Sequence, residues 1–125
     1  MHSGGPSTSV IIENNTFDNV TGNARYFIDY NTRTVGTFTF KNNILGKTLS
    51  SANTARGIRY TGTSLLVDNS YQTSDAIITS NVIPNISVYA QASTDLFTNP
   101  SAGNFLIKDG TFVGKSNAGD PRWRQ

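Results

Sequence analysis

Residues 10–17 read VIIENNTF, and this stretch decides the fold that the sequence predicts. The same order of apolar strand, charged residue and Asn-centred bend returns at residues 38–45 as FTFKNNIL. A shorter copy, LLVDNSY, occupies residues 65–71, and a weaker one, FLIKDGTF, occupies residues 105–112. Asn is one of the residues that tolerate the left-handed backbone of tight bends. We therefore interpret each copy as one strand and one bend of a repeating unit.

The spacing of the copies predicts a parallel β-helix, a solenoid in which each coil stacks on the next. Asn15, Asn43 and Asn69 are separated by 28 and 26 residues. The step from Asn69 to Gly110 is 41, so an irregular segment or an extra half-coil is expected between them. Residues 77–83, IITSNVI, are interpreted as a second strand within the same coil. In such a stack each repeat buries its inner face only against its neighbours, and stacked Asn amides can hydrogen-bond along it.

The composition excludes helical folds. Asn, Ser and Thr make up 43 of the 125 residues, and Val, Ile and Thr together number 33, whereas there are 6 Leu and 1 Glu. β-Branched and turn-forming residues have replaced the straight-chain helix formers, which rules out a helical bundle and a doubly wound α/β fold. The alternative is an antiparallel β-sandwich, whose strands would recur about every 8–12 residues with hairpin signals. Because the chain has no Asn-Gly pair, the solenoid is favoured.

Charge and hydropathy exclude several classes of partner. The formal net charge is +2 and the basic residues are scattered singly, so the basic stripe typical of nucleic-acid binding is absent. No apolar run approaches the roughly 20 residues that a membrane helix needs. There is no Cys, which excludes disulfides and zinc-thiolate sites. Residues 1–8 contain no apolar core of a signal peptide and are expected to be disordered.

The C-terminal third carries the most specific motifs, which are STDLFTNP at 93–100, NFLIKD at 104–109 and GKSNAGDPRW at 114–123. Together with the Asn-Asn bends, they resemble the C-terminal segment of pectate-lyase-like right-handed parallel β-helix proteins of Bacteroidetes, a domain of unknown function. The likeness covers roughly residues 9–124. It implies a right-handed parallel β-helix, a secreted or cell-surface setting and an association with plant or host polysaccharides. It implies no defined activity.

The tail is expected to close the solenoid. We divide the chain into an N-terminal segment at 1–8, coils over 9–92, and a C-terminal coil and cap over 93–125. Solenoids need atypical ends, because an open coil edge is a template for aggregation. A polar turn at 95–100 would lead the chain back across the end, and Trp123 would pack on the final coil. The N-terminal edge has no comparable cap, so its expected partners are upstream coils of a longer chain or a second copy.

A column of charged residues offers the best candidates for catalysis. The resemblance to pectate lyases implies Ca²⁺ held by carboxylates and an Arg or Lys that abstracts the proton beside a uronate carboxylate. Stacking of the motif copies would align Lys41 between Glu13 and Asp68, so that two acids flank a base. The alternative is a solvated face of alternating charge, worth at most about 1 kcal/mol per exposed pair. No two acids lie within four residues of each other, so no metal site is predicted.

A second cluster combines arginines and tyrosines and is the candidate for binding an acidic sugar chain. Arg forks grip carboxylates in a bidentate manner, and Tyr offers a flat apolar body with a hydroxyl. Strand alternation would place Tyr26 and Ile28 on one face with Tyr30. Arg25 and Asp29 would lie on the opposite face. The alternative is that the tyrosines fill the core while the arginines cover the surface. The members of the cluster are Arg25, Tyr26, Asp29, Tyr30 and Arg33, with Arg56, Arg59 and Tyr60 about one coil later.

Three functions follow from these observations. The first is an accessory or structural β-helix domain of a secreted carbohydrate-associated protein, which contacts acidic polysaccharide and has no catalysis or cofactor of its own. The second is a polysaccharide lyase that acts by β-elimination with Ca²⁺, in which Lys41 or an arginine of the second cluster is the base. The third is a purely structural solenoid that oligomerises. The scattering of the acids favours the first function over the second.

Overall fold

The computed structural model describes residues 7–49, 52–62 and 65–125, and no helix among them is long and apolar enough to cross a membrane. The N-terminal segment expected to be disordered lies mostly outside this range, and its last two residues already belong to the first strand. The described elements are β1 (Ser7–Glu13), β2 (Thr16–Phe17), β3 (Tyr26–Lys41), β4 (Ile44–Leu45), β5 (Ala55–Gly62), β6 (Leu65–Asp68), β7 (Tyr71–Gln72), β8 (Ile78–Ser80), β9 (Ser87–Val88), α1 (Ser93–Leu96), β10 (Phe97–Asn99), η1 (Pro100–Ala102), β11 (Asn104–Ile107) and η2 (Pro121–Trp123).

Nearly all strand pairing is parallel. One sheet has the order β1-β3-β5-β8, with β6 also paired to β3, and a second sheet has the order β2-β4-β7-β9. Among the described strands, only β10 and β11 pair in an antiparallel manner. The predicted all-β class is confirmed. The antiparallel sandwich is wrong, because parallel neighbours require long crossover connections rather than the tight hairpins of a sandwich.

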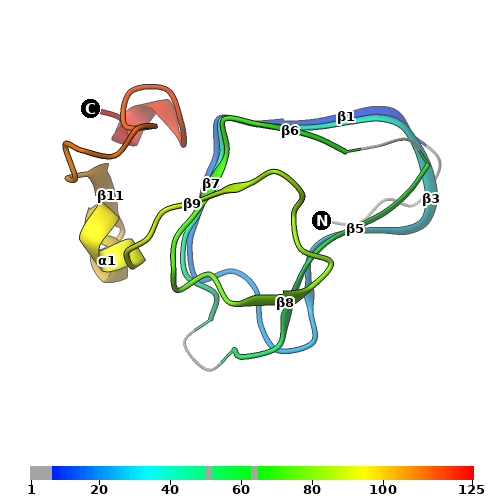
Figure 1. The fold of residues 1–125 in the computed structure, drawn as a ribbon, viewed down its shortest axis with the longest axis horizontal. Coiled ribbons are helices and arrows are strands. Elements are labelled where there is room, and N and C mark those ends of the chain that lie inside the picture. The colour runs from blue at the N-terminus through cyan, green and yellow to red at the C-terminus, as the bar shows by residue number, and fades with distance from the viewer. Residues whose placement is uncertain (1–6, 50–51, 63–64) are drawn as a thin grey trace.

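Successive passes of the chain, which we call circuits, lie on one another with a nearly constant offset. Ile12 pairs with Phe40, and Phe40 pairs with Val67, which gives offsets of 28 and 27 residues. Figure 1 shows the circuits superposed in projection, with β1 and β6 along the upper edge and β7 and β9 along the left edge. Because the parallel strands are in register, equivalent side chains of the repeat form columns along the stack.

The Asn bends form the most regular column. Asn14, Asn42 and Asn69 have left-handed backbones, with φ of 60°, 55° and 43°. Asn42 Nδ2 donates to Asn14 Oδ1 at 3.2 Å, and Asn69 Nδ2 donates to Asn42 Oδ1 at 2.9 Å. The predicted left-handed bends and stacked amides are therefore confirmed. The predicted alignment of Asn69 with Asn15 and Asn43 is wrong by one residue, because the second circuit is one residue shorter than the first.

The inner face of the circuits is packed with aliphatic and aromatic side chains. On β6 the exposure alternates, with Leu65 and Val67 buried and Leu66 and Asp68 exposed, as the two-residue period of a strand requires. A single circuit cannot bury its inner face alone, so this shared core holds the circuits together. Its buried members are Ile12, Phe27, Ile28, Tyr30, Val35, Phe38, Phe40, Leu45, Ile58, Leu65, Val67, Ala76 and Ile83.

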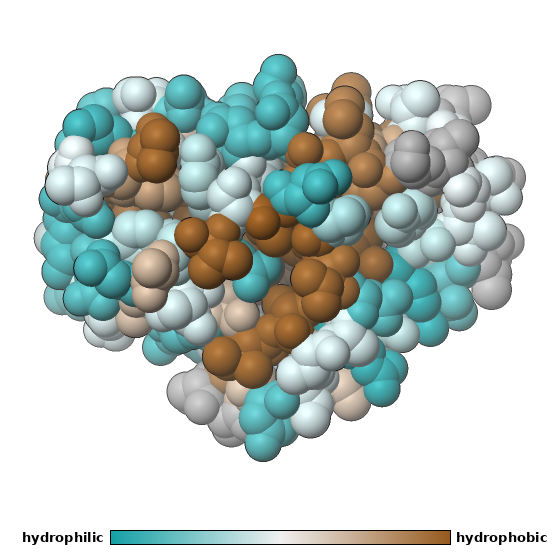
Figure 2. All heavy atoms as spheres, viewed as in Figure 1, coloured by the Kyte–Doolittle hydropathy of each residue, from teal (hydrophilic) through white to brown (hydrophobic). Residues whose placement is uncertain are grey.

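The last circuit is cut short and closes one end of the stack. β8 pairs with β5, as expected for a second strand in the same circuit as β7, but β9 then pairs with β7 at an offset of only sixteen residues. In Figure 1 the segment 81–88 runs across the ring that the circuits outline. Ile83 in this segment is 1% exposed and belongs to the inner core, so it plugs the end. Figure 2 shows a band of apolar side chains across this face, and Val82 and Val88 are exposed.

The tail after β9 packs on the outside of the sheet β2-β4-β7-β9. This differs from the expected position across the end of the stack, which Ile83 already fills. Residues 95–100, expected to form a polar turn, belong to α1, β10 and the start of η1. Residues 105–112 are not a fourth copy of the repeat, because β11 pairs with β10 and not with a circuit. The buried residues of this second core are Ile44, Leu96, Phe97, Ile107, Phe112 and Ala118.

The final residues of the tail tie the circuits together. Gly119 N donates to Asn42 O in the second circuit at 2.8 Å, and Asp120 N donates to Thr16 Oγ1 in the first circuit at 3.0 Å. Gly119 has a φ of 77°, and a Cβ at this position would lie 2.7 Å from Thr16 Oγ1, so the close approach requires glycine. Trp123 packs edge-on against β11 within the tail, rather than on a circuit.

Candidate functional site

The arginines and tyrosines of the second cluster come together where β3 and β5 run side by side. The register pairs Tyr26 with Arg56 and Asp29 with Arg59. Arg59 grips Asp29 with two hydrogen bonds, from Nε to Oδ1 at 2.9 Å and from Nη2 to Oδ2 at 2.8 Å. The predicted stacking of the two arginine-tyrosine stretches on adjacent circuits is confirmed.

Tyr26 lies beneath two arginines. The Cζ atom of Arg59 is 4.0 Å from the ring centroid and that of Arg56 is 5.2 Å from it, both within cation–π range. Tyr26 therefore lies on the outer face of the sheet, and its predicted position on the face of Ile28 is wrong. The reason is that Phe27 is 8% exposed and Ile28 is 2% exposed, so the chain turns two consecutive side chains inward and the alternation breaks.

The other two tyrosines of the cluster contribute to the core, Tyr30 as a buried member and Tyr60 as a partly buried residue packed against it. Tyr30 is buried, and its ring centroid is 5.5 Å from that of Phe38. Tyr60 contacts the same Phe38 ring at 5.9 Å, and its hydroxyl accepts a hydrogen bond from Leu65 N at 3.3 Å. These two candidate binding residues therefore pack against the interior of the fold. The side chain of Arg33 lies outside the described part of the chain.

The rest of the cluster forms a partly exposed basic surface, which we call the arginine face. Three arginines and one aspartate give it a formal charge of +2. The hydrogen bonds to Asp29 raise the pKa of Arg59, which strengthens its cationic state. The side chains of Arg59 and Asp29 keep 32% and 25% of their exposure, and Arg25 is exposed. The surface can thus present guanidinium groups to an anionic ligand. Its members are Arg25, Tyr26, Asp29, Arg56 and Arg59.

The charged column is also assembled by the register. Lys41 pairs with Glu13 on one side and with Asp68 on the other, and all three side chains are exposed. Neither acid forms an ion pair with Lys41 in the described structure. Within the described ranges, no three Asp, Glu or His side chains converge as a metal site. The column has a formal charge of −1, the opposite sign to the arginine face, so it offers an anionic ligand no net attraction.

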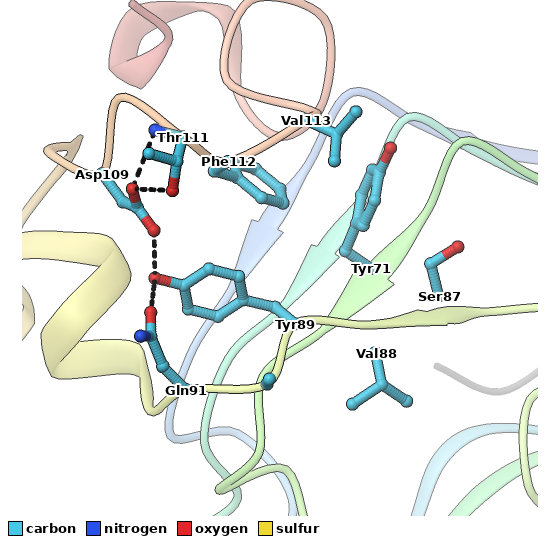
Figure 3. Close-up of a pocket in the computed structure, with 10 residues that line it drawn as sticks. Tyr71, Ser87, Val88, Tyr89, Gln91, Asp109, Thr111, Phe112 and Val113 are labelled. Carbon is cyan, nitrogen blue, oxygen red and sulfur yellow. Dashed lines mark hydrogen bonds between the residues drawn. The ribbon is translucent and has the colours of Figure 1, made fainter.

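A pocket of about 550 Å³ lies between the last circuit and the tail (Figure 3). Its wall consists of three rings packed edge to face, with the Phe112 centroid 4.9 Å from that of Tyr71 and 5.5 Å from that of Tyr89. At the rim, Val88 is 67% exposed and Val113 is 82% exposed. We call this the tyrosine pocket, and it is lined by Tyr71, Ser87, Val88, Tyr89, Ala90, Gln91, Asp109, Thr111, Phe112 and Val113.

Asp109 is the charged group of the tyrosine pocket. Its Oδ1 accepts hydrogen bonds from Thr111 Oγ1 at 2.6 Å and Thr111 N at 2.8 Å, and its Oδ2 accepts from the Tyr89 hydroxyl at 2.6 Å. These bonds, the Thr111 hydroxyl first, lower the pKa of Asp109, so the carboxylate is ionised at neutral pH. Burial and the bond to Asp109 raise the pKa of Tyr89, whose oxygen also lies 2.8 Å from Gln91 Oε1. The pocket therefore combines one fixed negative charge with three rings.

Residues 10–123 match a family described as the domain of unknown function DUF5123. The chain belongs to this family. The match confirms that the chain contains a domain of unknown function, over nearly the residues that the sequence predicts. No curated protein and no solved structure matches the chain.

Sequence spacing does not predict the tyrosine pocket of this DUF5123 domain. Tyr71 ends the third copy of the motif, at a position that holds Thr16 and Ile44 in the first two copies. Phe112 lies in the tail segment 105–112, which is not a copy of the repeat. Their meeting depends on the tail folding back against β7, which no repeat encodes. The available signal is side-chain size, because Thr16, Ile44 and Tyr71 occupy one column. Tyr71 is the largest side chain of that column, in which Ser87 comes next, and its ring requires a cover.

Proposed function

We propose that this DUF5123 domain is the C-terminal part of a right-handed parallel β-helix, and that it binds acidic polysaccharide through the arginine face without catalysis of its own. Parallel pairing at offsets of 27 and 28 residues, together with the column of left-handed Asn bends, supports the β-helix. The resemblance to pectate-lyase-like proteins of Bacteroidetes supports a secreted or cell-surface, carbohydrate-associated setting.

The observation that carries the binding proposal is the position of two arginines on one ring. Arg56 and Arg59 both lie over Tyr26, and this packing restricts their side chains before any ligand arrives, which lowers the entropy lost on binding. Arg59 is engaged by an acid, whereas Arg56 has no ion-pair partner among the described residues. Its donors are therefore open to a carboxylate, which a guanidinium binds in a bidentate manner.

The extent of the arginine face favours a chain of uronates over a single small anion. Arg56 N donates to Arg25 O at 2.8 Å, so the backbones of these two arginines are adjacent across two circuits. One exposed charge contact contributes little, because water and salt screen it. Several contacts made by one ligand add up, since the later ones are intramolecular. A polymer with repeated carboxylates can make them together.

The test is calorimetric titration of the domain with an oligogalacturonate at low salt. The variant Arg56→Gln is expected to weaken binding about fivefold. Arg122→Gln is the control for the loss of one arginine, because the Cζ atom of Arg122 also lies near an aromatic ring, 5.7 Å from the centroid of Trp123, but Arg122 belongs to the tail. The control is expected to bind like the wild type. Equal binding by Arg56→Gln and the wild type, or an equal loss in both variants, would overturn the proposal.

A polysaccharide lyase is the second candidate, and the alignment of Lys41 between two acids favours it. Against it, the negative charge of that column repels the polyanion that a lyase must bind. The test is the ultraviolet absorbance of unsaturated product when the domain is mixed with polygalacturonate and Ca²⁺. Turnover that disappears in Lys41→Ala would establish the lyase and overturn the binding-only proposal. A stable oligomer that binds no glycan would instead support a purely structural solenoid.

A further inference from the structure

The tyrosine pocket and the arginine face lie on different sides of the ring and carry opposite charge. In Figure 1, β9 and the tail are at one side of the ring and β5 is at the other. We propose that the tyrosine pocket is a second ligand site, and that it takes a neutral sugar ring. This site goes beyond the binding of acidic polysaccharide, because its chemistry excludes the uronates that the arginine face attracts.

Asp109 and the two hydroxyl groups bound to it leave an acceptor open rather than a donor. The Tyr89 hydroxyl and the Thr111 hydroxyl both donate to Asp109, so their protons are already used. A carboxylate has about four acceptor sites, and three on Asp109 are occupied, which leaves one on Oδ2. A ligand that binds Asp109 must therefore supply an O–H or N–H donor. A wholly apolar occupant would shield the carboxylate from water without compensation, which is unfavourable.

Charge and ring geometry narrow the ligand class further. The ionised Asp109 repels a carboxylate, which excludes a uronate. A cation held by an aromatic cage needs space between ring faces, within about 6 Å of each centroid. Here the Tyr71 and Phe112 centroids are 4.9 Å apart, and those of Phe112 and Tyr89 are 5.5 Å apart, so the rings are in contact with each other. They form one continuous wall and leave no space for a cation between them.

A neutral pyranose meets each of these requirements. Its apolar C–H face can lie against the ring wall, and its hydroxyl groups can donate to Asp109. Figure 3 shows Tyr71, Phe112 and Tyr89 side by side, with Asp109 beyond Tyr89. The volume of about 550 Å³ is within the range of roughly 300–1,000 Å³ usual for small-molecule sites. The exposed rim residue Val113 offers further apolar contact.

The test follows the tyrosine ring signals by NMR while neutral tetrasaccharides of β-linked glucose or galactose are added. One of these sugars is expected to shift the signals of Tyr71 and Tyr89. Asp109→Asn keeps the shape of the side chain and removes its charge, and it is expected to weaken binding about tenfold. Asp68→Asn is the matched control, because Asp68 is exposed on β6 outside the pocket, and it should bind like the wild type.

A second variant tests the site without touching the hydrogen bonds of Asp109. Val113 is 82% exposed, so Val113→Ala leaves the fold intact and is expected to weaken sugar binding about twofold by removing rim contact. Arg56→Gln should leave neutral-sugar binding unchanged, so failure of this site is distinguishable from failure of the arginine face. Absence of ring shifts with both sugars, or wild-type affinity in both pocket variants, would overturn the proposal.

Discussion

Two columns of polar side chains cross the same circuits, and burial separates their roles. Next to the Asn bends, Asn43 is fully buried, and its side chain accepts from Asn15 N at 3.0 Å and donates to Ile12 O at 2.9 Å. On the arginine face, Arg59 keeps a third of its exposure and bonds a partly exposed acid, Asp29. A buried group left without its partner costs about 1–3 kcal/mol, whereas exposed ion pairs add little to stability. The buried column therefore holds the fold, and the exposed one is free to bind.

Replacing Asn43 by Leu is expected to have the largest effect on stability. The substitution removes the side-chain partner of Asn15 N, which is part-buried, and of Ile12 O, which is buried. The free energy of unfolding should fall by about 2–4 kcal/mol in urea denaturation. Asn53→Leu is the control, because Asn53 is exposed, and it should change that free energy by less than about 0.5 kcal/mol. Wild-type stability in Asn43→Leu would show that the buried amides do not hold the circuits.

A pair of substitutions at Asn42 separates backbone strain from amide stacking. Both Asn42→Gly and Asn42→Ala remove the hydrogen bonds along the column, but only alanine places a Cβ in a left-handed backbone with φ of 55°. Alanine should therefore be less stable than glycine by about 1 kcal/mol, measured by urea denaturation. Equal stability of the two variants would mean that the bend relaxes to another conformation.

The sequence predicts the parts of the molecule in which a local constraint repeats. A left-handed bend admits few residue types, so the Asn column is visible in the spacing of Asn14 and Asn42. Once that spacing is known, register also brings Lys41 beside its acids and Arg59 beside Asp29. These positions depend only on counting along the repeat.

Other parts depend on packing that occurs once in the chain. The outward position of Tyr26 results from two consecutive inward side chains, and strict alternation cannot predict that. The segment that contains Ile83 interrupts the repeat, so the buried position of Ile83 cannot be predicted from the repeat. The tyrosine pocket requires Phe112 to return to a strand about 40 residues earlier, which no short-range pattern specifies.

Acid is expected to destabilise the tail, because it protonates two carboxylates there, whereas the buried Asn column contains no titratable group. Hydrogen bonds from Thr111 and Arg122 lower the pKa values of Asp109 and Asp120 below the ordinary 3.8. Each carboxylate thus stabilises the folded state above pH 3.8. This contribution is lost as the pH falls through the lowered pKa that the group has in the folded state. The double variant Asp109→Asn, Asp120→Asn should lose less melting temperature than the wild type between about pH 5 and pH 2.

At Asp18 the change of folding stability with pH is expected to have the opposite sign. Burial raises the pKa of Asp18, so its ionisation as the pH rises through the raised value opposes folding. When the pH falls, Asp18 becomes protonated in the wild type and its unfavourable ionisation is removed, whereas Asp18→Asn gains nothing. The melting temperature of this variant should therefore fall more than that of the wild type over the same pH interval. An identical pH dependence in the wild type and the variants at all three aspartates would contradict these assignments.

The smallest effect on stability is expected at Arg56. This side chain is partly exposed and contacts Tyr26 without an ion-pair partner among the described residues. Arg56→Gln should change the free energy of unfolding by less than about 0.5 kcal/mol in urea denaturation. A loss of several times that amount would assign the arginine face a structural role like that of the buried Asn column.

The most direct test of the arginine face is an NMR titration of the ¹⁵N-labelled domain with an oligogalacturonate. The predicted result is a shift of the Arg56 and Arg59 Nε–H signals, together with the amides of β3 and β5 beside them, that saturates and weakens with added salt. Saturable shifts confined to Glu13, Lys41 and Asp68, or no shift at low salt, would contradict the assignment of acidic-polysaccharide binding to this face.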